Sequence, residues 1–202
     1  MMSDPFKYPT TKHLRRHGPD GCSVEIYKRW LRDEFTFRCV LCLWRERWRK
    51  PWHGGFHVIS FTPRNSTPSP ATARTEYESL LLVCGGCYGV LPKNHVQLPD
   101  PCLVSMVALL EVAEDGGIRS CNQEGERLIQ LLRLGNEQLK AERAELIRKV
   151  SSSHEERLRQ MGFPDDMPNL AAPPHPPRNL IPNSEANSWH AQRLAGSLPK
   201  FY

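Results

Sequence analysis

The stretch LLLVCGGCYGVL, residues 80–91, contains the feature that decides the fold: Cys84 and Cys87, separated by two residues. A second pair with the same spacing lies upstream in FRCVLCLWRERW, residues 37–48. A Cys-x-x-Cys turn holds two thiols close enough to share one metal ion, and four thiolates complete a tetrahedral structural zinc site. The predicted zinc ligands are Cys39, Cys42, Cys84 and Cys87.

Composition is consistent with a metal site inside the cell. The chain has 202 residues and a mean hydropathy of −0.53, enough for one domain with exposed segments. No apolar run approaches the roughly 20 residues that span a bilayer, and the first 18 residues lack the apolar segment of a secretion signal. We therefore expect a cytoplasmic protein without membrane contact, where cysteines favour metal binding over disulfides.

The alternative for the two pairs is a redox dithiol or a set of free buried thiols. A redox pair is typical of a strand-to-helix turn of the thioredoxin kind, whereas Cys39 and Cys42 lie in an aromatic, β-rich stretch. The remaining three of the seven cysteines, Cys22, Cys102 and Cys121, are interpreted as small buried apolar residues.

Positive charge is concentrated in the first 60 residues, where 12 Lys and Arg face six Asp and Glu. This balance suits a phosphate backbone, and it suits a solvated basic surface equally well. Tryptophans alternate with basic residues in RERWRKPWH, residues 45–53, where cations contact phosphates and exposed rings stack on bases. Trp30 and Trp44 are expected in the core. The predicted nucleic-acid contacts are Arg45, Arg47, Trp48, Arg49, Lys50 and Arg64.

The N-terminal half reads as an arm, a helix and a zinc finger. Residues 1–21 are predicted to be a flexible basic arm because proline and glycine interrupt any helix. Residues 22–35 predict a helix with Ser23 as N-cap. Residues 55–63 predict a strand, and residues 64–76, rich in Ser, Thr and Pro, an exposed loop. The predicted buried face of the helix consists of Val24, Tyr27, Trp30, Leu31 and Phe35.

The C-terminal half reads as a hairpin, two helices and a tail. EDGGIRS, residues 114–120, predicts a hairpin turn, and two helical patterns break near Gly135. Residues 163–202 are rich in proline and predict a disordered tail. In the second helix a packing face with its arginine at the edge is expected from Leu139, Arg143, Leu146, Ile147 and Val150.

The order of these motifs resembles the HNH endonuclease family, in particular bacterial members with LRDEF-FRC-YC before the first thiol pair and YxNLLxxCxxCNxxK at the second. The corresponding segments here are LRDEFTFRCVLC, ISFTPRN and YESLLLVCGGCYGVL, followed by PDPC, EDGG and LLRLGNEQLKAER. The resemblance covers about residues 20–150. It implies an α+β fold: a ββα-metal, treble-clef zinc core at residues 22–98, with a helical C-terminal extension at residues 99–162.

The family's catalytic positions carry other residues in this chain. In the family, a histidine that follows an aspartate activates water, and the aspartate binds a divalent metal together with a later Asn or His. The resemblance implies that these positions correspond to Ile59, Ser60 and Tyr88, and that the asparagine that orients the histidine corresponds to Ser79. Isoleucine cannot bind a metal and neutral serine is a weak base, so we predict impaired or lost nuclease activity, with structural zinc and no catalytic metal.

Three nearby residues are candidates to replace the lost groups: His57, Glu78 and His95. His57 precedes Ser60 by three positions and is expected on the opposite face of a strand. Three functions stay open: a DNA-binding protein of HNH type with impaired or lost catalysis, an active metal-dependent DNA endonuclease with a rearranged site, and a zinc-scaffold protein-interaction module.

Overall fold

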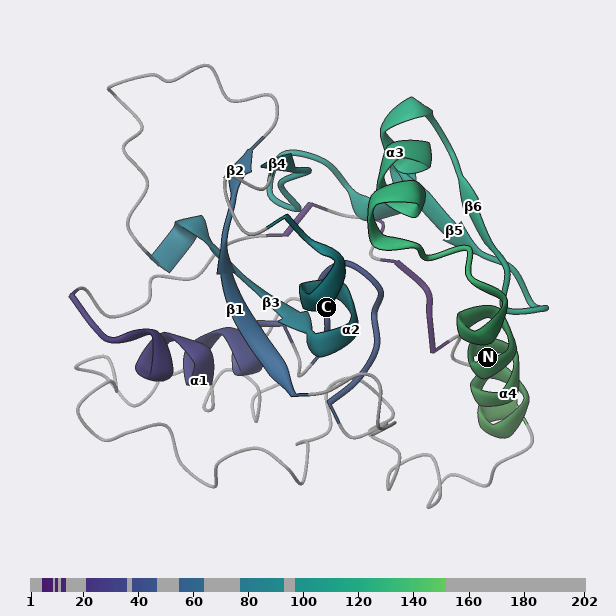
Figure 1. Ribbon diagram of the computed structural model, residues 1–202, viewed down its shortest axis with the longest axis horizontal. Coiled ribbons are helices and arrows are strands. Elements are labelled where there is room, and N and C mark those ends of the chain that lie inside the picture. The colour runs from purple at the N-terminus through teal and green to yellow at the C-terminus, as the bar shows by residue number, and fades with distance from the viewer. Residues whose placement is uncertain are drawn as a thin grey trace.

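The computed structural model describes residues 5–8, 10, 12–13, 21–35, 38–46, 55–63, 77–92 and 97–151. This part of the chain is an α+β fold in which helices surround three two-stranded sheets (Figure 1). The α+β class is therefore as predicted. None of the helices in these residues is long and apolar enough to cross a membrane.

Helix α1, Val24–Glu34, begins after Ser23, whose carbonyl accepts the amides of Ile26 and Tyr27 at 3.0 Å. The residue therefore stands at the predicted N-cap position. Val24 is 50% exposed, so its place on the buried face is wrong: the buried face begins at Tyr27, later in the same turn. The buried face consists of Tyr27, Trp30, Leu31 and Phe35.

The centre of the fold is the antiparallel hairpin of β1, Phe56–Ser60, and β3, Leu80–Cys84. All five residues of β3 are buried, because α1 and the short helix α2, Gly85–Val90, both pack against the hairpin (Figure 1). The 3₁₀ turn Tyr77–Ser79 leads into β3. Two short strands, β2 at Thr62–Pro63 and β4 at Gln97–Leu98, pair in parallel beside it.

The C-terminal part contains the predicted hairpin, with β5 at Leu110–Val112 and β6 at Ile118–Ser120, and helices α3, Gln123–Leu132, and α4, Glu137–Ser151. A second 3₁₀ turn, Met106–Ala108, precedes β5. The two helices break at the left-handed residue Arg133 (φ 53°), close to the predicted break. Asn122 caps α3 by accepting the Gly125 amide at 2.9 Å.

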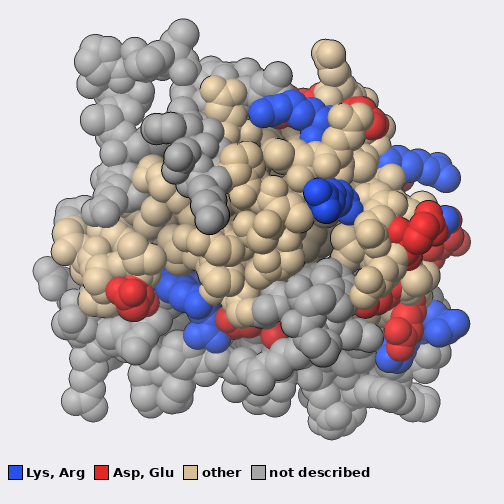
Figure 2. All heavy atoms as spheres, viewed as in Figure 1, with Lys and Arg blue, Asp and Glu red and all other residues tan. Residues whose placement is uncertain are grey.

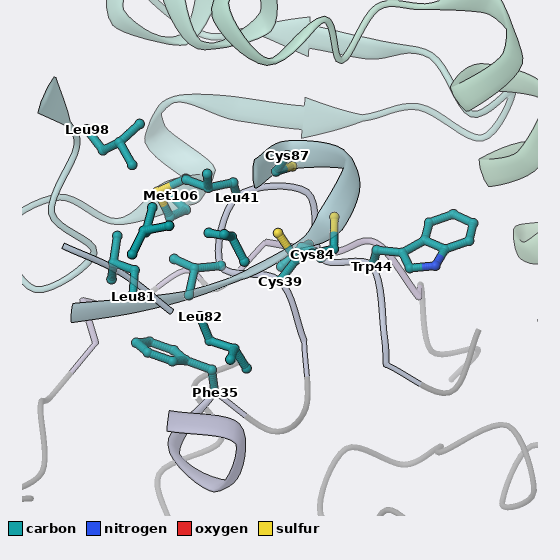
Figure 3. Packing of buried hydrophobic residues seen from close by; sticks show 14 of the residues in the cluster. Phe35, Cys39, Leu41, Trp44, Leu81, Leu82, Cys84, Cys87, Leu98 and Met106 are labelled. Carbon is teal, nitrogen blue, oxygen red and sulfur yellow. The ribbon is translucent and has the colours of Figure 1, made fainter. Parts of the chain in front are cut away.

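One hydrophobic core joins these parts. Leu31 of α1, Leu82 of β3 and Leu128 of α3 belong to the same buried cluster, and all are 0% exposed. Figure 3 shows side chains from Phe35 to Met106 packed around Leu81 and Leu82 of β3. Residues on both sides of the predicted boundary between residues 22–98 and 99–162 therefore belong to one buried cluster, and the boundary itself stays a prediction.

Two features differ from the sequence predictions. In the segment expected to be a flexible arm, Phe6, Tyr8 and His13 are 1%, 3% and 4% exposed; their side chains are anchored in the core although the backbone is irregular. Arg143 of α4 is buried rather than at the edge of a packing face, because it donates to the carbonyls of Gly116 at 2.6 Å and Leu134 at 3.0 Å.

Several sequence predictions fall outside the described residues. They concern the loop at residues 64–76, the tail at residues 163–202 and the end of the helical extension at residues 152–162. Trp52 and His95 also lie outside. These predictions stay predictions.

Candidate metal centre

The first thiol pair is held by a tight turn. The Cys39 amide donates to the Trp44 carbonyl at 2.9 Å, the Leu43 amide donates to the Cys39 carbonyl at 2.9 Å, and Leu43 has a positive φ of 61°. The amide of Val40 donates to the carbonyl of Leu82 at 3.1 Å. The turn is thereby attached to β3, the strand that ends at the second pair.

The second pair lies where β3 becomes α2. Cys84 is the last residue of the strand, and Cys87 lies in the first turn of the helix. The change from extended to helical backbone turns both side chains toward the first pair. Figure 3 shows Cys39, Cys84 and Cys87 gathered at the end of β3, with Trp44 beside them.

The four sulfur atoms lie within 4.8 Å of one another, and the Sγ atoms of Cys42 and Cys84 are 3.6 Å apart. An ion with metal–sulfur bonds of about 2.3 Å, as in zinc sites, requires a sulfur–sulfur separation of about 3.8 Å in a tetrahedron. The sequence prediction that Cys39, Cys42, Cys84 and Cys87 converge is confirmed, and the group has the donors and the dimensions to hold one metal ion. Among the described residues it is the one such group of His, Cys, Asp or Glu side chains.

The thiols act strongly on one another. Burial raises the pKa of Cys39, but hydrogen bonds from Cys42, Cys84 and Cys87 outweigh burial and hold its pKa well below the ordinary value. Hydrogen bonds to Cys39 are the largest cause that raises the pKa of Cys42 and Cys87 well above theirs. One negative charge is therefore favoured in the cluster and further thiolates are disfavoured. A bound dication removes this obstacle because its charge compensates additional thiolates.

A cavity of about 270 Å³ lies between the thiols and the C-terminal helices. Cys42, Cys84 and Cys87 line one side, and Leu139 and Arg143 line another. Burial lowers the pKa of Arg143, while the negative charge of Tyr8, of Cys42 and of Asp115, when these groups are ionised, acts in the opposite direction. Burial outweighs these charges, so the pKa of the Arg143 guanidinium is lowered overall.

The other three cysteines differ in exposure. Cys22 and Cys102 are half-buried, so their predicted burial holds only in part. Cys121 is exposed, so its predicted burial is wrong. It follows β6 directly, and its amide donates to the Leu109 carbonyl at 2.9 Å.

The positions expected to correspond to the HNH catalytic residues lie around β1. Ile59 is 8% exposed and Ser60 is exposed at the end of the strand. Ser79 precedes β3, and its carbonyl accepts the Phe61 amide at 3.1 Å. Tyr88 lies in α2 and is 49% exposed. None of these four side chains belongs to a metal-binding group within the described residues.

Of the candidate replacements, His57 contacts one of these positions. Its ring stacks on Tyr88 with centroids 4.2 Å apart and planes 8° apart. Because β1 pairs with β3 without interruption, His57 and Ser60 lie on opposite faces of the strand. Glu78 is half-buried in the turn before β3, and His95 lies outside the described residues.

The predicted nucleic-acid contacts divide into one buried residue and five outside the description. Arg45 is 5% exposed, and its backbone forms an isolated β-bridge with that of Arg38. Burial, followed by the charge of Arg38, lowers the pKa of Arg45 well below the ordinary value. Burial of this side chain disfavours a phosphate contact, and its predicted role stays a prediction. On the face shown in Figure 2, charges of both signs gather over α3, α4 and the β5–β6 hairpin. The contacts outside the described residues are Arg47, Trp48, Arg49, Lys50 and Arg64.

A buried polar group escaped the sequence analysis. The Nε2 atom of His13 lies 2.7 Å from Oε1 of Glu34, and the Tyr77 hydroxyl donates to Oε2 of Glu34 at 2.6 Å. The His13 and Glu34 side chains are 3% and 0% exposed. Along the chain, His13 is 21 residues from Glu34, and Tyr77 is 43 residues from Glu34, so no local spacing could have revealed these contacts. The group fastens the N-terminal segment to the end of α1.

Comparisons with protein-family models, with curated proteins and with solved structures found no match to this chain.

Proposed function

We propose that this chain is a zinc-stabilised nucleic-acid-binding protein of HNH type whose nuclease activity is impaired or lost. The observation that carries the proposal is the convergence of two thiol pairs where a β-hairpin passes into a short helix. The resemblance in sequence implies a ββα core clamped in this way, and β1, β3 and α2 follow one another in that order.

Zinc is the metal that fits the donor set best. Four thiolates are soft ligands typical of structural zinc, and they fill all four tetrahedral positions. When bound, zinc supplies the positive charge that keeps the four thiols deprotonated. Cys39 and Cys42 would then be held to Cys84 and Cys87, which ties the knuckle to the hairpin. With no position open for water, this centre stabilises the fold and does not catalyse hydrolysis.

The chemistry expected at the family's active site lacks its donors here. The alkyl side chain of Ile59 is almost fully buried and has no atom that binds a cation. The hydroxyl of Ser60 is exposed, and a water-exposed neutral hydroxyl takes up protons poorly near pH 7. Tyr88 faces the ring of His57. Phosphodiester cleavage would therefore lack both a general base and a metal ligand.

Nucleic-acid binding without cleavage would use the basic N-terminal part of the chain. Because Arg45 is buried, the proposal rests on the other five predicted contacts: Arg47, Trp48, Arg49, Lys50 and Arg64. Contacts of this kind bind phosphates and depend on salt. The matching test is DNA binding at several salt concentrations, in which neutralising Arg47, Arg49 and Lys50 weakens binding across sequences and flattens the salt dependence. DNA binding that changes neither with salt concentration nor with these substitutions would contradict the proposal.

A plasmid-nicking assay tests the loss of activity. The zinc-loaded chain is incubated with Mg²⁺, Mn²⁺ or Ni²⁺, with EDTA as control, beside an Ile59→Asp/Ser60→His double variant and a His57→Ala variant. We expect no cleavage by the native chain and metal-dependent nicking by the double variant, since it restores a ligand and a base. Metal-dependent cleavage by the native chain that His57→Ala abolishes would show an active nuclease and overturn the proposal.

A further inference from the structure

A pair of stacked aromatic rings, His57 and Tyr88, lies beside the metal centre. We call this pair the His57–Tyr88 step. Tyr88, 49% exposed, is one of three large apolar residues that are open to solvent within the described residues. One face of its ring is covered by the parallel ring of His57, 4.2 Å away. A methyl group built on the neighbouring Gly89 would meet no non-neighbouring atom within 4 Å, so the helix surface next to the tyrosine is open. The two rings form a flat surface on which a further ring can stack.

The step is held in place by rigid elements. His57 pairs with Val83 in the uninterrupted β1–β3 register, and Tyr88 directly follows the metal-site residue Cys87 in α2. The two rings therefore need no large rearrangement to present their surface. Preorganised aromatic surfaces bind with a smaller loss of conformational freedom than mobile ones.

One basic residue lies on the helix that packs beside the step. Lys28 is half-buried in α1, and α1 packs against β1, the strand that carries His57. In agreement with this packing, the charge of Lys28 is the second cause, after burial, that lowers the pKa of His57. A neutral imidazole stacked on a phenol, with an ammonium group nearby, offers a ring surface together with a counter-charge for an anion.

We infer that the His57–Tyr88 step, with Lys28 beside it, binds an unpaired nucleobase and its adjacent phosphate, so that the protein prefers single-stranded over duplex nucleic acid. This inference rests on the proposed nucleic-acid binding and specifies its substrate class. Aromatic side chains stack on bases that are splayed out, whereas base faces inside a duplex are covered by their neighbours. Lysine supplies the phosphate contact that a purely apolar protein ligand would not need.

The test measures binding of the zinc-loaded full chain to a labelled oligothymidylate and to a duplex with the same number of phosphates, by fluorescence anisotropy. The variants are Tyr88→Ala, Tyr88→Phe and Lys28→Gln, with Leu103→Ala as a control because Leu103 is similarly exposed (45%) on another segment. Metal content and circular dichroism confirm that each variant is folded.

We expect Tyr88→Ala to weaken binding of the single strand about 5- to 150-fold, with a smaller loss for the duplex. Tyr88→Phe keeps the ring and should bind like the native chain, while Lys28→Gln should lower the slope of log K against log salt by about 0.7. Equal losses for the two DNA forms, or no effect of Tyr88→Ala, would overturn this inference but leave the proposed function standing. Absence of binding to either DNA would overturn both.

Discussion

Removing one hydroxyl group from Tyr77 tests the buried polar group at the N-terminal side of the core. Tyr77 is 1% exposed and donates to Glu34, whose side chain is 0% exposed, at 2.6 Å. Tyr77→Phe keeps the ring and its packing against Tyr27, 5.6 Å between centroids, and removes the hydroxyl that donates to Glu34. Such a bond to a charged group is worth about 1.5–3 kcal/mol, which corresponds to a fall in Tm of about 3–12 °C for a chain of this size.

The measurement is urea and thermal unfolding, followed by circular dichroism at equal metal loading. Tyr88→Phe is the matched control because it removes the hydroxyl of a half-exposed tyrosine, and it should change the free energy of unfolding by less than about 0.5 kcal/mol. His13→Gln combined with Tyr77→Phe should be non-additive, because both residues contact Glu34. A loss for Tyr77→Phe no larger than that of the control would refute the reasoning.

Three further predictions concern packing and charge. Gly125→Ala places a methyl group 1.9 Å from the Leu109 carbonyl oxygen and should destabilise the fold by more than about 2 kcal/mol. Gly89→Ala, in open space on α2, should instead stabilise it by about 0.5–1 kcal/mol. Chemical denaturation of the two variants measures both changes. Arg143→Met removes donors to two carbonyls and should cost about 2–4 kcal/mol in the same experiment, with exposed Lys149→Met near zero. His57 should titrate below its ordinary pKa of 6.5 because burial, followed by the charge of Lys28, lowers its pKa. Its contribution to stability is therefore complete above pH 6.5 and is lost as the pH falls through the folded-state pKa. NMR titration should show that Lys28→Gln raises the pKa of His57.

The cluster of four thiols could be predicted from sequence because its signal is local. Two residues between paired cysteines suffice to place both thiols on one turn, and the structure brings the two turns together. Of the five positions that the helical period similarly predicted to be buried, four are buried: Tyr27, Trp30, Leu31 and Phe35. It failed for Val24 because periodicity identifies a face but not how far along the helix that face is covered.

The features that sequence did not reveal depend on distant partners. Arg143 is buried because it meets the carbonyl of Gly116, 27 residues away, and a charged residue on an apolar helix face is ordinarily expected at its edge. Likewise the prolines near the N-terminus indicate the absence of a helix, but they do not indicate whether an irregular segment packs. Phe6 packs against Trp44, with 6.0 Å between the ring centroids. The Tyr8 hydroxyl donates to the Leu41 carbonyl at 2.8 Å.

The proposed function requires that one metal ion join the two thiol pairs and hold the fold. The most direct measurement is the metal content of the purified chain, together with its unfolding before and after chelation, for the native protein, Cys84→Ser and the exposed-cysteine control Cys121→Ser. We predict one zinc ion per native chain and per Cys121→Ser chain, and loss of zinc from Cys84→Ser. Chelation should abolish cooperative unfolding, because structural zinc contributes about 10–16 kcal/mol to a fold whose net stability is about 5–15 kcal/mol. A native chain that binds no metal, or that unfolds identically with and without chelator, would contradict it.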